Sequence, residues 1–257
     1  MKKSMKIEDG ILIKCGDIAG DVIVPHGVRA VGDNAFYQCG SIESITIPET
    51  VTSIGNCAFK YCDHAESIIL PEKTDRMGAE VFEYCWKLRE VVLPKGVRSI
   101  GETMFEGCSS LERIVIPDSV EHISRRAFSS CKRLRSIEIN MKKLDILPYS
   151  VRNYAVMGCI TAHTYDREED AGEQQLAVNE YIRKHNRSFF DIVLSSDSKA
   201  GVNYIISNDL LDPALIDTFL ALSSRQKRGE ITAMLLSYKE RLGLTGIEKE
   251  EEWDPFL

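Results

Sequence analysis

The chain has 257 residues, of which 44% are hydrophobic and 28% are charged, with a net charge of −7 at pH 7. This composition is typical of a globular protein that is long enough to bury a core, and the acidic balance argues against a general nucleic-acid binder, which needs a basic surface. No run of 18 apolar residues is present, so the sequence predicts no transmembrane helix.

The N-terminal segment MKKSMKIEDGILIKCG has early lysines but no apolar stretch or small-residue cleavage site of a secretory signal. We therefore expect a cytoplasmic protein. The alternative, a secreted or cell-surface location, applies if a signal has been removed.

One segment recurs five times at constant spacing. Pro25 and Pro48 lie 23 residues apart (48 − 25), and equivalent residues in later copies keep this step. A fixed period of this length predicts a solenoid with one coil per copy. The residues in register are the prolines Pro25, Pro48, Pro71, Pro94 and Pro117, the phenylalanines Phe36, Phe59, Phe82, Phe105 and Phe128, and the cysteines Cys39, Cys62, Cys85, Cys108 and Cys131.

Each copy begins with a short predicted strand, as in Ile42-x-x-Ile45-x-Ile47. Inward and outward residues alternate there, stacked coils would pair the strands into a parallel sheet, and proline ends each strand because it lacks an N–H. We expect the phenylalanines to form a stacked internal spine. Four glycines, which we expect to hold a backbone angle that a side chain would resist, follow in the second half of the copies: Gly32, Gly55, Gly78 and Gly101.

The unit I-x-x-I-x-I-P…V-x-x-I-G-x-x-A-F-x-x-C resembles the BspA-like bacterial leucine-rich repeats, over roughly residues 8–140. The resemblance implies a curved, right-handed solenoid that binds a protein or a surface ligand, and many members of that family are cell-surface proteins.

The period disappears after Pro148, and helical spacing replaces it. Residues 171–185 place Leu176, Val178, Tyr181 and Ile182 on one helical face. A second stretch, NRSFFDIVLSS, follows, and Asp212-Pro213 and Gly229-Glu230 introduce two further helices, with Gly243 as a stop. The pair from Leu215 to Leu242 weakly resembles an ankyrin-type hairpin, although the T-P-L-H signature is absent.

We therefore expect an α/β leucine-rich-repeat solenoid of short parallel strands followed by an α-helical domain that covers the last coil. The predicted ranges are 8–146 for the solenoid with its N-terminal cap, 147–246 for the helical domain and 247–257 for an acidic tail.

Three surfaces are candidates for binding. The outward strand residues form either a binding strip with an apolar centre or an ordinary strand surface that suits β-branched residues. The aromatic residues beside the Phe–Cys segment form either a contact patch or packing between turns. The basic last coil is a dock for an acidic partner or for the acidic tail, or an ordinary solvated face. The strand face comprises Ile23, Thr46, Ile69, Val92, Val115 and Glu138; the rim aromatics are Tyr37, Tyr61, Tyr84 and Trp86; the basic patch comprises Arg125, Arg126, Lys132, Arg133 and Arg135.

The cysteine column favours buried, reduced thiols, although neighbouring coils at ~5 Å would also bring such cysteines towards bonding distance. Cys57, Cys62 and His64 lack the second half of a metal site. The sequence contains no GxxxxGK[ST], GxSxG or HExxH motif, and Cys159 has no catalytic context. We expect neither enzyme activity nor a metal or cofactor.

The predicted function is a non-catalytic module that binds a protein or peptide partner on the solenoid surface. The alternative is a cell-surface adhesin or carbohydrate-binding module.

Overall fold

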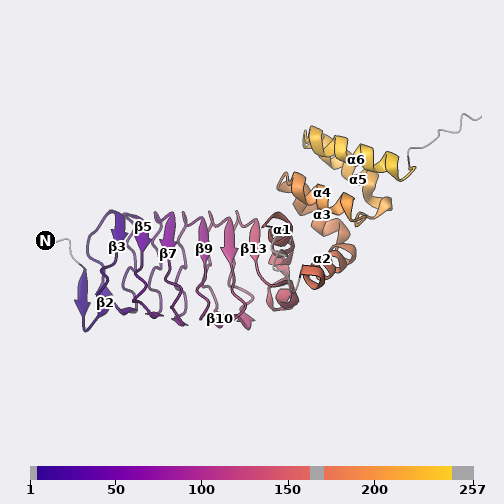
Figure 1. Ribbon diagram of the computed structural model, residues 1–257. Coiled ribbons are helices and arrows are strands. Elements are labelled where there is room, and N and C mark those ends of the chain that lie inside the picture. The colour runs from indigo at the N-terminus through magenta and orange to yellow at the C-terminus, as the bar shows by residue number, and fades with distance from the viewer. Residues whose placement is uncertain (1–4, 163–170, 245–257) are drawn as a thin grey trace, which may run out of the picture. The chain divides into compact units, whose positions relative to one another are not determined.

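The computed structural model describes residues 5–162 and 171–244 (Figure 1). The chain forms two compact units, Met1–Gln174 and Gln175–Leu257, and each is described by itself below. The first unit contains all the coils and the first α-helix. Among the described residues, no helix combines the length and the apolar character needed to cross a bilayer.

The main sheet of the first unit is a parallel ladder with one strand from each coil (Figure 1). Its order, β13-β11-β9-β7-β5-β3, follows the chain because each coil returns the backbone to the same place one step further on. Ile45 pairs with Ile68, which is the predicted step of 23 residues and confirms the predicted solenoid. The strands are β3 (Gly20–Ile23), β5 (Ile42–Thr46), β7 (Ser67–Ile69), β9 (Glu90–Val92), β11 (Arg113–Val115) and β13 (Ser136–Glu138).

A second set of short strands, which the sequence did not predict, runs through the other half of each coil and forms two separate sheets. Its strands are only two residues long and carry the V-x-x-I-G segment, so no alternation could reveal them. At the N-terminal end, β1 (Lys6–Glu8) and β2 (Ile11–Lys14) form an antiparallel hairpin that pairs with β4. The short strands are β4 (Ala30–Val31), β6 (Ser53–Ile54), β8 (Arg76–Met77), β10 (Ser99–Ile100) and β12 (His122–Ile123).

The predicted phenylalanine spine forms the centre of the coils. Four of the five side chains are completely buried, and Phe128, in the last coil, is 6% exposed. Successive ring centroids lie 5.3, 5.7, 5.3 and 5.6 Å apart, and the angles between their planes decrease along the chain as 30°, 16°, 5° and 3°. Rings at such separations add offset-stacking attraction to the burial of apolar area, so the spine links every coil to the next.

The predicted reason for the four repeat glycines, an unusual backbone angle, is wrong. None of the four repeat glycines has a positive φ. At two of them the requirement is space, because a Cβ on Gly55 would lie 2.5 Å from the Asp33 nitrogen and one on Gly78 would lie 2.5 Å from the Asn56 nitrogen. Gly101 has open space around it, so space does not require glycine there.

The left-handed backbone occurs instead at two other positions of the first four copies and at one of them in the fifth, where most residues are not glycine. One column lies just before the buried phenylalanine and the other just after it, and the chain turns sharply at both. Such angles are costly for side chains larger than Asn or Asp. The columns are Asn34, Cys57, Glu80 and Thr103, and Gln38, Tyr61, Tyr84, Gly107 and Ser130.

The last coil is covered by helix α1 (Arg152–Ala162), which follows two 3-10 turns, η1 (Met141–Ile146) and η2 (Tyr149–Val151). Gly158 allows the close approach, because a Cβ there would lie 2.7 Å from the Ile137 carbonyl oxygen of β13. The cover over the open end of the core therefore comes from α1, within the first unit.

The second unit is helical, with α2 (Ala171–Lys184) beginning just before it. Asp212 accepts a hydrogen bond from the Ala214 nitrogen and precedes Pro213, and Gly243 has φ +67, both as predicted. Leu176 is 56% exposed, which contradicts its predicted place on the buried face of α2. The remaining elements are α3 (Asn186–Ser195), α4 (Lys199–Ser207), which the sequence did not reveal, η4 (Pro213–Leu215), α5 (Ile216–Arg225) and α6 (Gly229–Arg241).

Candidate binding surfaces of the solenoid

The outward residues of the main sheet form a column across the strands. The ladder registers Ile23 with Thr46, Thr46 with Ile69 and Val115 with Glu138. Ile23 is 72% exposed, Ile69 is 58% exposed and Val92 is 54% exposed. Single exposed apolar residues are common on proteins, but a row of them held by one sheet is a feature of interaction surfaces. We call Ile23, Thr46, Ile69 and Val92 the apolar strip.

The far end of the same column is charged. Glu138 accepts a hydrogen bond from Arg113 Nε at 2.6 Å, and Arg113 also pairs with Glu90, so that one guanidinium joins three coils. The hydrogen bond to Glu138 is the main reason why the pKa of Arg113 is raised. The side chain of Glu138 is only 16% exposed. The six-residue column therefore consists of the four-residue apolar strip, the half-buried Val115 and the charged Glu138. The sequence analysis overlooked Arg113.

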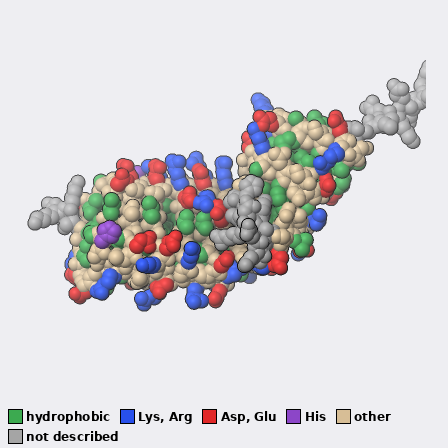
Figure 2. Space-filling model, viewed as in Figure 1, with side chains coloured by type: hydrophobic (Ala, Val, Ile, Leu, Met, Phe, Trp, Pro, Cys, Tyr) green, Lys and Arg blue, Asp and Glu red, His purple; other side chains and the backbone are tan. Residues whose placement is uncertain are grey.

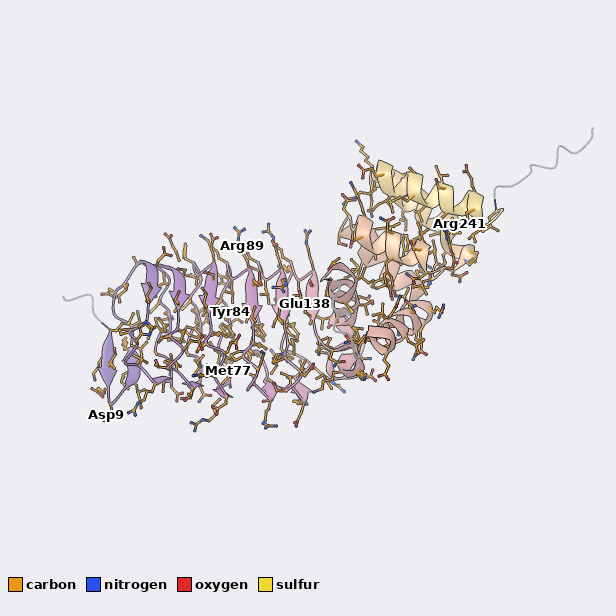
Figure 3. The ribbon with its side chains drawn as sticks, in the orientation of Figure 1. Asp9, Met77, Tyr84, Arg89, Glu138 and Arg241 are labelled. Carbon is orange, nitrogen blue, oxygen red and sulfur yellow. The ribbon has the colours of Figure 1, made fainter. Side chains whose placement is uncertain are left out.

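Acidic side chains flank the apolar strip in the second and third coils. Glu43 and Glu49 lie three residues before and after Thr46, and Glu66 and Glu72 have the same places around Ile69. All four are exposed, and only Glu66 pairs with a described cation, Arg89, at 3.5 Å. Figure 3 shows Arg89 at the edge of the solenoid where the strands begin.

The space-filling view agrees with this description. Hydrophobic side chains gather over the first coils, and both acidic and basic side chains lie around them (Figure 2). The acidic flanks of the second and third coils follow from the positions of the four glutamates.

The rim tyrosines pack on one another. Tyr37 meets Tyr61 edge to face at 5.8 Å between ring centroids, and Tyr61 stacks on Tyr84 at 5.0 Å. The ring of Tyr84 lies over Gly107, and Trp86 is 48% exposed. The contacts between neighbouring turns are therefore present, while the use of these residues for binding stays a prediction.

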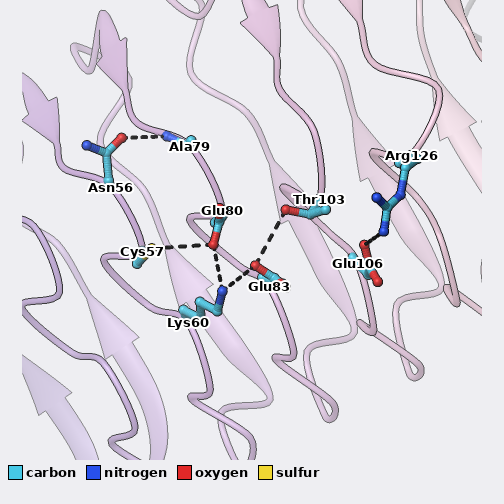
Figure 4. A network of polar contacts seen from close by, with 9 residues as sticks. All are labelled: Asn56, Cys57, Lys60, Ala79, Glu80, Glu83, Thr103, Glu106 and Arg126. Atoms are coloured by element: carbon cyan, nitrogen blue, oxygen red, sulfur yellow. Dashed lines mark hydrogen bonds and ion pairs between the residues drawn. The ribbon is translucent and has the colours of Figure 1, made fainter.

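A polar network that the sequence analysis did not find lies beside the tyrosines (Figure 4). Lys60 Nζ lies 2.6 Å from Glu80 Oε2 and 2.7 Å from Glu83 Oε2. Thr103 donates to Glu83 at 3.4 Å, and the Cys57 thiol donates to Glu80 at 3.6 Å. The network ties three coils together.

Burial and hydrogen bonding together set the protonation of the three ionisable side chains, Lys60, Glu80 and Glu83. Burial acts to lower the pKa of Lys60, but the hydrogen bonds to both carboxylates outweigh it and raise the pKa, so the ammonium stays charged. The hydrogen bond from Lys60 lowers the pKa of Glu80, whereas burial raises that of Glu83. The network thus holds one cation of the second copy between two carboxylates of the next.

All five residues of the predicted basic patch are on the surface. Arg125, Lys132 and Arg133 are exposed, as are Arg126 and Arg135. Arg126 pairs with Glu106 of the preceding coil at 3.2 Å. The acidic tail 247–257, which we expected to reach this patch, lies outside the described residues.

The eight cysteines are free. In the column, the Cys62, Cys85, Cys108 and Cys131 thiols donate to the phenylalanine carbonyl of the preceding coil at 3.0 to 3.1 Å. Within the described ranges, no group of three or more metal-binding side chains comes together. Cys159 is buried in α1.

Comparison with known proteins agrees with this architecture. The family model described as "BspA type Leucine rich repeat region" matches residues 21–160 in six copies. No curated protein matches the chain.

Several solved structures are similar to the solenoid. A leucine-rich cell surface protein from Faecalibacterium prausnitzii is 34% identical over 50% of this chain and 34% of its own, with a TM-score of 0.48. A leucine-rich repeat protein from T. pallidum is 29% identical over 54% of this chain and 69% of its own, with a TM-score of 0.49. The chain thus corresponds to about a third of the first of these proteins. With the repeats matched over more than half of its length, the chain belongs to the BspA-type leucine-rich-repeat family.

Proposed function

We propose that the protein is a non-catalytic interaction module that binds a protein or peptide partner on the strand face of the solenoid. One observation supports the proposal: the apolar strip exposes Ile23, Ile69 and Val92 on a sheet whose backbone is fixed by the neighbouring coils. A partner would gain apolar burial there while the solenoid loses little conformational entropy.

The strip has a suitable length for a short segment. Four strands at ~4.8 Å per step span roughly 14 Å, which an extended chain covers with about four or five residues running across the strands. We propose a loop or an extended peptide as the bound element.

The test is capture of a partner from lysate of the native host, followed by binding measurements with the purified partner. The Ile69→Glu/Val92→Glu variant should lose the partner, and Ile69→Lys/Val92→Lys should lose it too, because both remove apolar contact whichever charge they add. The matched control is Ser99→Glu/His122→Glu. It alters two exposed residues that pair with each other between β10 and β12, away from the main sheet.

The three variants should keep the circular-dichroism spectrum of the parent. Undiminished binding by well-folded Ile69→Glu/Val92→Glu would place the partner on the rim, the basic patch or the helices.

A further inference from the structure

The surroundings of the apolar strip carry information about the chemistry of its partner. Within residues 43–49 and 66–73, which cover the strip in the second and third coils, there are four glutamates and a single cation, Lys73. Asp21 adds a further exposed carboxylate in the first coil, where it accepts a hydrogen bond from Ser44 at 2.5 Å. In the second and third coils, a glutamate precedes and a glutamate follows the outward residue by three positions, so the acidic residues lie before and after the strip.

Most of this charge is not neutralised by the residues that the structure describes. Glu43, Glu49 and Glu72 make no ion pair with a described residue, and the pair of Glu66 with Arg89 is long, at 3.5 Å, and exposed. Elsewhere on the same sheet face the carboxylates are paired, since Arg113 forms ion pairs with both Glu90 and Glu138. The unneutralised carboxylates therefore coincide with the apolar part of the face.

The charge of the side chains that flank the strip changes from negative to positive at the fourth coil. Val92 is flanked at the same two positions by Arg89 and Lys95, both exposed. The acidic surroundings thus extend over the second and third coils and stop there. This arrangement gives the strip a direction, because its two ends attract opposite charges.

We infer that the partner segment is cationic and amphipathic: apolar side chains lie on the strip, and Lys or Arg side chains on both sides of it face the second and third coils. An acidic residue of the segment faces Arg89 and Lys95. This inference rests on the proposed function and adds the chemical class of the partner. Complementary charge of this kind sets orientation and the rate of encounter, while the apolar contact supplies affinity.

The test uses labelled peptides of about eight residues, long enough to cross the strip at ~3.3 Å per residue. One alternates Lys with Leu and the other alternates Glu with Leu. Titrated with the intact chain, the Lys–Leu peptide should bind about tenfold or more tightly than the Glu–Leu peptide, and raising the salt to about 0.5 M should abolish most of that difference.

The whole chain is acidic, so a control must separate local from overall charge. Glu49→Gln/Glu72→Gln removes two carboxylates beside the strip and should weaken the Lys–Leu peptide about fivefold. Glu102→Gln/Glu121→Gln removes two exposed carboxylates that adjoin the other ladder, β10 and β12, and should leave binding unchanged.

Equal weakening by both variants, or equal binding of the two peptides, would overturn the inference. The proposed function is judged separately. A natural partner that is lost with Ile69→Glu/Val92→Glu but binds normally to Glu49→Gln/Glu72→Gln would keep the strand face as the binding surface and overturn the cationic partner. A natural partner indifferent to both variants would overturn the two proposals together.

Discussion

The ring of Tyr84 covers Gly107, the residue at the equivalent place in the next coil. A Cβ on Gly107 would lie 2.4 Å from Tyr84 Cδ1, and Gly107 also has φ +76. The tyrosine stack that begins at Tyr37 therefore ends at Gly107, which has no side chain to continue it. The aromatic side chains and the glycine belong to one packing arrangement.

Gly107→Ala should lower the free energy of unfolding by about 1–3 kcal/mol, because the new methyl group meets the Tyr84 ring and the backbone angle disfavours a side chain. Urea unfolding measures the change. Gly101→Ala is the matched control, since nothing lies within 4 Å of a Cβ there. In a Tyr84→Ala background the cost of Gly107→Ala should become smaller; an unchanged cost would mean that the ring contributes nothing.

Phe82→Ala should lower the free energy of unfolding by roughly 3–5 kcal/mol, since it leaves a cavity in a completely buried spine. Phe82 stacks on Phe59 and Phe105 at 5.7 and 5.3 Å. Thermal and urea unfolding measure the loss. Phe82→Leu should cost clearly less, and a melting temperature for Phe82→Ala within a degree of the parent would contradict the role of the spine.

Asn56→Ala should lower the free energy of unfolding by about 0.5–1.5 kcal/mol, because the Asn56 side chain accepts a hydrogen bond from the Ala79 nitrogen at 2.9 Å. Asn56→Asp keeps an acceptor, as Asp33 does for the Asn56 nitrogen one coil earlier, and should be nearly neutral. Comparable losses in the two variants would show that the acceptor is unimportant.

The column thiols should resist alkylation in the folded protein. Burial raises the pKa of Cys85 and Cys108 well above the usual range and that of Cys131 to about 12, so almost no thiolate exists at about pH 8. Cys39 differs, because its hydrogen bond with the Cys15 thiol lowers its pKa. Iodoacetamide labelling followed by peptide mass spectrometry should find Cys39 modified before Cys85, and the reverse order would contradict the assignment.

The same thiols make stability depend on alkaline pH. In the unfolded chain they ionise near the ordinary value of 9.0, whereas in the fold they remain protonated. The folded state then binds more protons, so its stability is full below pH ~9 and falls as pH rises further. Comparing urea unfolding at about pH 8 and pH 10 measures this. Cys85→Ala/Cys108→Ala should show a shallower fall than the parent.

The sequence predicted the elements that repeat with every copy. The strand at Ile42–Ile47, the phenylalanine spine and the buried cysteines appear at fixed spacing, and each has a single place in a stacked coil. The outward residues of the strand face were also identifiable, because inward and outward positions alternate along a strand.

Features that depend on contact between particular coils could not be predicted. The division of the strand face at Arg113 follows from one side chain that reaches Glu90 and Glu138 in different coils. The reason for Gly55 lies in the backbone of Asp33, one coil earlier. Periodicity shows that positions are equivalent, but it does not show which side chains meet between them.

The close fit of α1 on β13 also constrains how the protein can change its length. Contacts between consecutive coils are alike through the middle of the array, so a duplication or deletion of 23 residues there would join equivalent surfaces. The final coil has no such freedom, because Gly158 needs the bare carbonyl of Ile137 beneath it. Variation in coil number among related genes should therefore arise inside the array, with the junction between the last strand and its helix inherited as one piece.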